Sequence, residues 1–412
     1  MVCCVVSDTE AWRPVCLASC LFCAIRTVHA VMLNIDGSEI QANTASTAGL
    51  QVASLAGQPA EPPVSVEEVT QALNNMRNAP SDPKIIEAGC NIIHGRGYTD
   101  PNKDWFLDIK GLEPVIEALE SFPVVKGVQL ACSQAVASMS LYNKRTMEAA
   151  GEGGVVELLV NIMRRWPEDP QMQIGGASGC FMDYSSANRA RWASEGGIEV
   201  NMASIVRFFD NPEAVLQGWF AFSSGAQPPN TERFAEAGGI ELAIRTMRAH
   251  AKSYRVREEV MQAMRQVGKI SDLSLRAVNK GWLEEVMKAL KDAPSDMHQQ
   301  SVGCANLAVY SGRNASFREK AVRLGAADVA LEALRAFPKM ISPASWPKSF
   351  ETQYTVREDC VDCLAQLSLD LEGAKMLREA QVTSEISMLL WQHPLNTRLQ
   401  TSGGVLLSKL KS

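Results

Sequence analysis

The sequence has few of the residues that enzymes use for catalysis. Only 5 of its 412 residues are histidines, and it contains neither an HExxH zinc motif nor a nucleophile-elbow serine. The CxxC motif of the expected helices, Cys360 to Cys363, has no second pair at zinc-binding spacing. We therefore predict that the protein is not an enzyme and uses no cofactor and no metal.

The sequence also lacks the features of membrane-spanning and nucleic-acid-binding proteins. It has no stretch of eighteen apolar residues without a charge, which excludes a stable membrane span on composition. Its net charge is −6, whereas proteins that bind nucleic acid broadly carry a basic surface. We expect protein or peptide partners and no nucleic acid.

What the chain does contain is a repeat. A glycine that precedes an apolar helical segment recurs at steps of 43, 43, 42, 42 and 44 residues. These glycines are Gly111, Gly154, Gly197, Gly239, Gly281 and Gly325. A fixed period of this length is typical of solenoid proteins. A glycine at each corner supplies the positive φ that ends one helix and starts the next.

Each repeat has room for three helices. A short amphipathic segment precedes the glycine, a longer one follows it, and a third follows that, as in residues 128–139, where Cys132, Ala135, Val136 and Met139 share one face. The segments from Asn143 to Gly154, from Asn188 to Gly197 and from Asn230 to Leu242 resemble the armadillo repeat family, with its Glu-Ala-Gly-Gly-Ile corner. HEAT repeats have similar helices without this corner and rank second.

The resemblance implies an all-α fold, a right-handed α-solenoid of about eight armadillo-like three-helix repeats, over residues 64–412. The step from Gly325 to Gln381 is 56 residues, so we expect an inserted loop near 338–354. The first 36 residues form a cysteine-rich apolar segment, and residues 37–63 have the composition of a flexible linker.

The role of the N-terminal segment stays open between a leader, a lipidated tail and a disordered tail. We expect a cytoplasmic protein, with an organelle-targeted or secreted protein, directed by residues 1–30, as the alternative. Six further cysteines lie in the expected helices, and we predict that they are buried free thiols in a reducing compartment. They are Cys90, Cys132, Cys180, Cys304, Cys360 and Cys363.

One stretch of the acidic chain is basic. From Arg245 to Lys280 there are nine basic and three acidic residues, so the local charge is 9 − 3 = +6. These side chains are either solvated helix faces or a docking surface for an acidic or phosphate-bearing partner. Arg265 and Lys269 are four residues apart, which places them on one face of the third helix of their repeat.

In the armadillo family the third helices line a concave groove, and many relatives that hold extended peptides carry a repeated Trp and Asn there. This chain lacks that ladder. The groove candidates that remain are Gln134, Ser138, Phe181, Phe220, Ser224, Arg265, Gln266, Lys269 and Tyr310. The resemblance implies a non-enzymatic scaffold that binds partner proteins or extended peptides. The alternative is a permanent structural subunit of a larger ciliary or organellar assembly.

Overall fold

The computed structural model describes residues 64–99, 103–141, 143–178, 185–228, 230–338 and 355–411. Residues 64–412 form one compact unit, and it alone is described below. The predicted segments 1–36 and 37–63, the core of the predicted insertion, Cys180 and Phe181 lie outside the described residues.

The described residues hold 23 helices and no strand, which confirms the all-α prediction. After an initial pair, α2 (Val66–Asn78) and α3 (Pro83–Thr99), the helices follow one another in sets of three. The first helices are α4 (Asp104–Asp108), α7 (Lys144–Glu152), α10 (Ser186–Ser194), α13 (Asn230–Glu236), α16 (Ser271–Asn279), α19 (Ala315–Arg323) and α22 (Leu371–Glu379). The second helices are α5 (Leu112–Ser121), α8 (Val155–Arg165), α11 (Gly197–Arg207), α14 (Gly239–Ala249), α17 (Trp282–Asp292), α20 (Ala326–Ala336) and α23 (Val382–Gln392). The third helices are α6 (Lys126–Ser140), α9 (Pro170–Ser178), α12 (Pro212–Gly225), α15 (Tyr254–Val267), α18 (Met297–Ser311), α21 (Val356–Leu367) and α24 (Thr397–Lys411).

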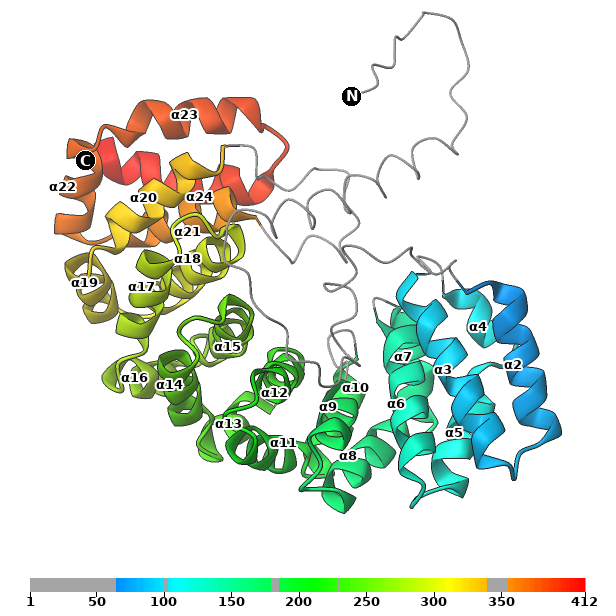
Figure 1. Ribbon diagram of the computed structural model, residues 1–412. Helices are drawn as coiled ribbons and strands as arrows, with labels where there is room; N and C mark the ends of the chain where they lie inside the picture. The colour runs from blue at the N-terminus through cyan, green and yellow to red at the C-terminus, as the bar shows by residue number, and fades with distance from the viewer. Residues whose placement is uncertain are drawn as a thin grey trace, which may run out of the picture. The chain divides into compact units, whose positions relative to one another are not determined.

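The third helices form a continuous layer. Each one packs on the third helix of the next repeat, from α3 and α6 through to α21 and α24. Figure 1 shows this layer along the inner side of the curved array, with the second helices on the outer side. A solenoid of this kind presents one long surface whose side chains come from repeats far apart in sequence.

The corner between the first and second helices uses one left-handed residue, and its position differs in part from the prediction. Gly154, Gly281 and Gly325 have positive φ, as predicted. In two of the three Gly-Gly pairs at these corners the left-handed residue is the first glycine, Gly196 or Gly238, and not Gly197 or Gly239, whereas in Gly153-Gly154 it is the second. At the remaining two corners the left-handed residue is not a glycine but Lys110 or Gln381, and Gly111 is right-handed.

In the pairs that end at Gly197 and Gly239, the second glycine is needed for close packing. At Gly239 a Cβ atom would lie 2.4 Å from the ring of Phe234, and at Gly197 it would lie 2.2 Å from the ring of Trp192. Both rings belong to the preceding first helix and are fully buried. The second helix therefore starts in direct contact with an aromatic side chain of its own repeat.

A recurring glutamine joins the second and third helices within a repeat. Its side-chain amide donates to two carbonyl groups at the end of the second helix, at 2.7–3.2 Å. The glutamines are Gln129, Gln173, Gln300 and Gln400. They satisfy carbonyls that a helix C-terminus otherwise leaves without a partner.

The prediction that all the cysteines of the helices are free thiols was wrong for two cysteines near the start of the array. Cys90 on α3 and Cys132 on α6 form a disulfide, with a Cα–Cα distance of 4.9 Å, so they are not free thiols. The two helices approach closely because Gly97 on α3 leaves space against α6, where a Cβ atom would lie 2.4 Å from the Ser138 hydroxyl. Cys304, Cys360 and Cys363 are free and buried, as predicted.

Candidate functional site

Much of the basic stretch is neutralised by carboxylates from neighbouring repeats. Arg276 on α16 and Lys280 bind Glu241 of α14 at 2.7 and 3.1 Å, and Arg248 binds Glu285 of α17 at 2.6 Å. Burial alone raises the pKa of Glu241, but Arg276 and Lys280 outweigh it and hold that pKa below its usual value. Both acidic partners lie outside the stretch whose local charge is +6. The stretch is therefore not one basic surface.

These pairs belong to a contact that recurs along the array. A basic residue of a first helix binds the acidic first turn of the preceding second helix, as in Arg233–Glu199 and Lys320–Glu284, at 2.8 and 2.7 Å. Another basic residue, near the end of a second helix, donates to the corner carbonyls of the next repeat. Residues in that second position are Arg77, Arg164, Lys291 and Arg335. Cations of the first and second helices thus connect repeats.

The cations of the third-helix layer are different. Arg265 and Lys269 of the α15 repeat and Arg313, just after α18, form no ion pair with a carboxylate among the described residues. Arg313 donates from Nε to the carbonyl of Gly268 at 3.1 Å, and Lys269 donates from Nζ to Oε1 of Gln266 at 2.8 Å. Burial lowers the pKa of Lys269, and the charges of Arg265 and Arg313 lower it further. The three groups are close enough to repel one another.

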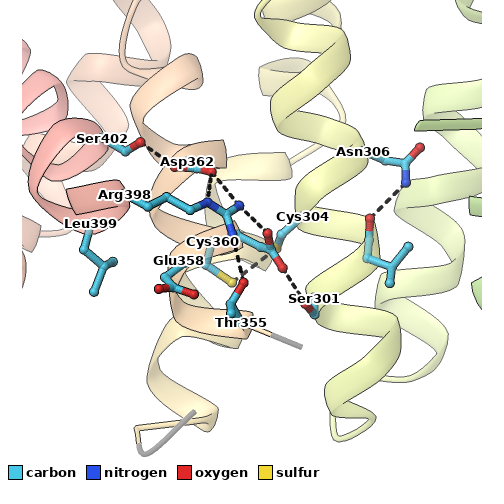
Figure 2. A network of polar contacts seen from close by, with 12 residues as sticks. Ser301, Cys304, Asn306, Thr355, Glu358, Cys360, Asp362, Arg398, Leu399 and Ser402 are labelled. Atoms are coloured by element: carbon cyan, nitrogen blue, oxygen red, sulfur yellow. Dashed lines mark hydrogen bonds and ion pairs between the residues drawn. The ribbon is translucent and has the colours of Figure 1, made fainter. Parts of the chain in front are cut away.

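Next to these cations, a polar network joins three consecutive third helices. Figure 2 shows Arg398 of α24 between carboxylates of α21, with Ser301 of α18 on the far side. Arg398 donates to Asp359 at 2.5 Å, to Asp362 at 2.8 Å and to the hydroxyl of Thr355 at 2.8 Å. The hydroxyl of Ser301 donates to Asp359.

The charges in this network depend on one another. Burial raises the pKa of Asp359, and the nearby Arg398 lowers it only in part. Burial by itself would lower the pKa of Arg398, but Asp359 and Asp362 reverse this and raise it. Arg265 also interacts electrostatically with Asp359 and with Arg398. This places the α15 cations beside the network.

We define the cationic face as Arg265, Lys269, Arg313 and Arg398, together with Asp359 and Asp362. Its formal charge is 4 − 2 = +2. No group of three or more histidine, cysteine, aspartate or glutamate side chains in the described ranges could hold a metal ion. The arrangement suits the binding of carboxylate or phosphate oxygens, for which arginine is the favoured partner.

The structure corrects several of the predicted groove residues. Ser138, Ser224 and Tyr310 are fully buried, so they do not contact a partner in the groove. The hydroxyl of Tyr310 donates to the Met264 carbonyl at 2.9 Å, between α18 and α15. Ser138 likewise faces the preceding inner helix, since a Cβ atom at Gly97 of α3 would lie 2.4 Å from its hydroxyl.

The other candidates remain near the surface, with one exception. Gln134 and Phe220 are partly exposed, as is Arg265, and Lys269 is exposed. Gln266 is only 7% exposed and accepts a hydrogen bond from Lys269 of the cationic face. A role of Gln134, Phe220, Arg265, Gln266 and Lys269 in binding a partner stays a prediction.

Sequence reasoning missed Arg313, Asp359, Asp362 and Arg398. Asp359 has one signal in the sequence, which is that it occupies the place of the recurring glutamine. It lies four residues after Thr355, the N-cap residue of α21, just as Gln300 lies four residues after Asp296, the N-cap residue of α18. A carboxylate at this place has no N–H group to donate to the helix-end carbonyls, and because it is buried it requires a cationic partner. That partner, Arg398, is 39 residues away in sequence.

Comparisons with known proteins agree with this architecture. An engineered protein superposes with a TM-score of 0.60 at 17% identity, covering 84% of this chain and 89% of its own. A structure from work on a phosphorylation switch that controls the interaction between cadherin and β-catenin gives 0.57 at 15% identity, covering 84% of this chain and 65% of that one. The array has the armadillo-repeat fold.

A designed armadillo repeat protein in complex with the peptide (KR)4 is also similar, with a TM-score of 0.49 at 13% identity, over 59% of this chain and 99% of that one. No protein-family model and no curated protein matches the sequence. The armadillo likeness is thus one of fold, and residue roles are argued from the chain itself.

Proposed function

We propose that this armadillo array is a non-enzymatic scaffold that binds an acidic segment of a partner protein on the cationic face. The single observation that carries the proposal is the division of the cations. Basic residues of the first and second helices are paired with a neighbouring repeat, whereas Arg265, Lys269 and Arg313 form no ion pair within hydrogen-bonding distance of a carboxylate in the described part of the chain.

The electrostatics favour an anion at this position. Three cations that lie close together repel one another, and an added carboxylate or phosphate relieves that repulsion. Arg313 and Arg398 are already held by hydrogen bonds, so little side-chain entropy is lost when a ligand binds them. The contacts are charge-assisted, so affinity falls as salt rises.

The test uses a fluorescent peptide of alternating glutamate and serine residues as the probe, with a lysine-serine peptide of equal length as its counterpart. The full chain is compared with R265E/K269E and with a matched control, K252E/R255E. Lys252 and Arg255 are exposed, lie in the same repeat and carry the same charge. We expect the acidic peptide to bind, R265E/K269E to weaken it at least about tenfold, and the control to change it less than about threefold.

Equal losses in the two variants would mean that net charge alone attracts the peptide. Preference for the lysine-serine peptide would reject the acidic-partner proposal. Once the probe behaves as expected, capture from a cell extract with the chain and with R265E/K269E identifies the natural partner.

A second function, permanent incorporation into a larger assembly, is favoured by one observation at the end of the array. Met388 and Trp391 of α23 and Leu395 after it are 60%, 81% and 81% exposed. In other second helices the place of Trp391 holds a basic residue such as Lys291 or Arg335, which contacts the next repeat. Exposed apolar side chains of this size often mark a protein interface.

Replacement of Trp391 by lysine, the residue type at this place in α17, separates the two functions. A subunit built in through this face loses its co-purifying partner in W391K and keeps acidic-peptide binding. A free scaffold shows no change in either.

The compartment remains a proposal as well. No described helix is both long and apolar enough to cross a bilayer. We propose a cytoplasmic protein, with an organelle or the secretory route as the alternative. The Cys90–Cys132 disulfide favours the alternative, because structural disulfides persist mainly in oxidising compartments. Alkylation of free thiols in intact cells, followed by mass spectrometry of these two cysteines, distinguishes the cases.

A further inference from the structure

Two free cysteines face each other beside the polar network. Cys304 of α18 and Cys360 of α21 are fully buried, and their Sγ atoms are 3.3 Å apart. Figure 2 shows the two side chains directed toward each other between the helices. The sulfur of one lies against the sulfur of the other, in a contact between repeats.

The same arrangement occurs near the other end of the array, where it is closed. Cys90 and Cys132 also lie on consecutive third helices, α3 and α6, and form a disulfide. The pairs α3–α6 and α18–α21 are the two most extensively packed pairs of helices in the unit. Close packing brings the backbones of two helices within the range that a disulfide spans.

We propose that Cys304 and Cys360 are a second inter-repeat disulfide site, which closes under oxidising conditions. Oxidised glutathione is a sufficient oxidant. The thiolate of one cysteine attacks a glutathione sulfur, which releases one reduced glutathione and leaves a mixed disulfide. The thiolate of the other cysteine then attacks the protein-bound sulfur and releases the second reduced glutathione. Two protein thiols are oxidised and one glutathione disulfide is reduced.

Closure is slow for physical reasons that the structure shows. Burial raises the pKa of the Cys360 thiol well above its ordinary value, so little thiolate is present at neutral pH. The oxidant reaches Cys304 and Cys360 only when α18 and α21 separate locally. The rate of closure therefore rises with pH and with mild denaturant, and the closed bond is protected from reductants by the same burial.

The cross-link lies directly under the cationic face. Asp359 precedes Cys360 in α21 and accepts a hydrogen bond from Ser301, one helical turn before Cys304. A covalent bond between α18 and α21 holds these two groups in register. The inference is independent of the proposed function, because it concerns which sulfurs bond and not what the face binds.

Cys363 is the competing partner. It is also buried, lies three residues after Cys360 and interacts electrostatically with Cys304. An assay has to separate the two thiols of the CxxC motif. The peptidase Asp-N does so, since it cleaves before Asp362, between Cys360 and Cys363.

The experiment incubates the full chain in glutathione redox buffers at pH 8, blocks free thiols in acid and maps Asp-N peptides by mass spectrometry. We expect a linked peptide containing Cys304 and Cys360, present in C363S and absent in C304S and C360S. The Cys90–Cys132 link is the internal positive control. Circular dichroism checks that each variant is folded, and reductant treatment of the unaltered chain provides a control that needs no substitution.

Two results would overturn the assignment. One is the absence of the Cys304–Cys360 link in a buffer where Cys90–Cys132 forms. The other is a Cys304–Cys363 link that persists in C360S and accounts for the oxidised product in the unaltered chain. Neither result depends on peptide binding, so failure here is distinguishable from failure of the proposed function.

Discussion

Replacement of Arg398 by glutamine should loosen the end of the array at α21 and α24. The side chain of Asp359 is 7% exposed, and Arg398 is its cationic partner at 2.5 Å. Breaking a fully buried ion pair costs about 3–5 kcal/mol, because one charge is left without compensation. The Arg398 side chain is 42% exposed, and water screens part of its effect. We therefore expect a loss of about 2 kcal/mol in the local stability of these helices.

The loss should depend on pH with a defined sign. The folded-state pKa of Asp359 is raised above its unfolded value, so the folded chain holds more protons between those two values. Stability accordingly falls as pH rises through that window. Removal of the Arg398 charge raises the folded pKa of Asp359 further and extends the window upward. R398Q should therefore cost more stability at pH 7.5 than at pH 5.

Hydrogen exchange with mass spectrometry measures this locally, which suits a repeat array whose parts unfold separately. A loss of about 2 kcal/mol corresponds to roughly 30-fold faster exchange in α21 and α24 relative to the unaltered chain. The control is D359N, which removes the carboxylate of Asp359 and leaves Asp362, whose side chain is 23% exposed, as the ion-pair partner of Arg398. R398Q should have a much smaller effect in the D359N background. An equal effect in both backgrounds, or one that does not change with pH, would refute the reasoning.

Three further substitutions test the repeat itself by urea denaturation. G197A should destabilise by about 2 kcal/mol or more, since the added methyl would lie 2.2 Å from the Trp192 ring. Q381G should stabilise by about 1 kcal/mol, because Gln381 is left-handed with a φ of 55°. Q300A should destabilise by about 1–2 kcal/mol, because a buried and a partly buried carbonyl at the end of α17 lose their donor. A stabilising G197A, a neutral Q381G or a neutral Q300A would each contradict the structural reason given for that substitution.

The sequence predicted the fold well because an armadillo array is specified locally. The glycine period and the apolar spacing depend on residues within one repeat, and both reflect helix geometry. The predicted left-handed residue was wrong at Gly197 and Gly239 because both glycines of each pair are required, for different reasons. Gly238 provides the backbone conformation, and Gly239 provides space for Phe234.

The candidate site was less predictable because it depends on contacts between repeats. The excess of basic residues from Arg245 to Lys280 is real in sequence, but Arg248 and Arg276 find their carboxylates in adjacent helices. Conversely, the α15 cations gain neighbours from α18, α21 and α24, up to 133 residues away, as for Arg265 and Arg398. Local charge counting cannot register either effect.

The two roles of the basic residues follow from where each helix lies in the repeat. A cation near the end of a second helix, such as Lys291, meets the corner carbonyls of the next repeat, where helix ends leave acceptors without donors. Arg265 and Lys269 lie on the inner layer, where the carboxylate of Asp359 beside Arg265 is already bound to Arg398. Neither cation forms an ion pair that joins two repeats of the described array, and burial lowers the pKa of both side chains. A ligand therefore explains these two cations better than folding does.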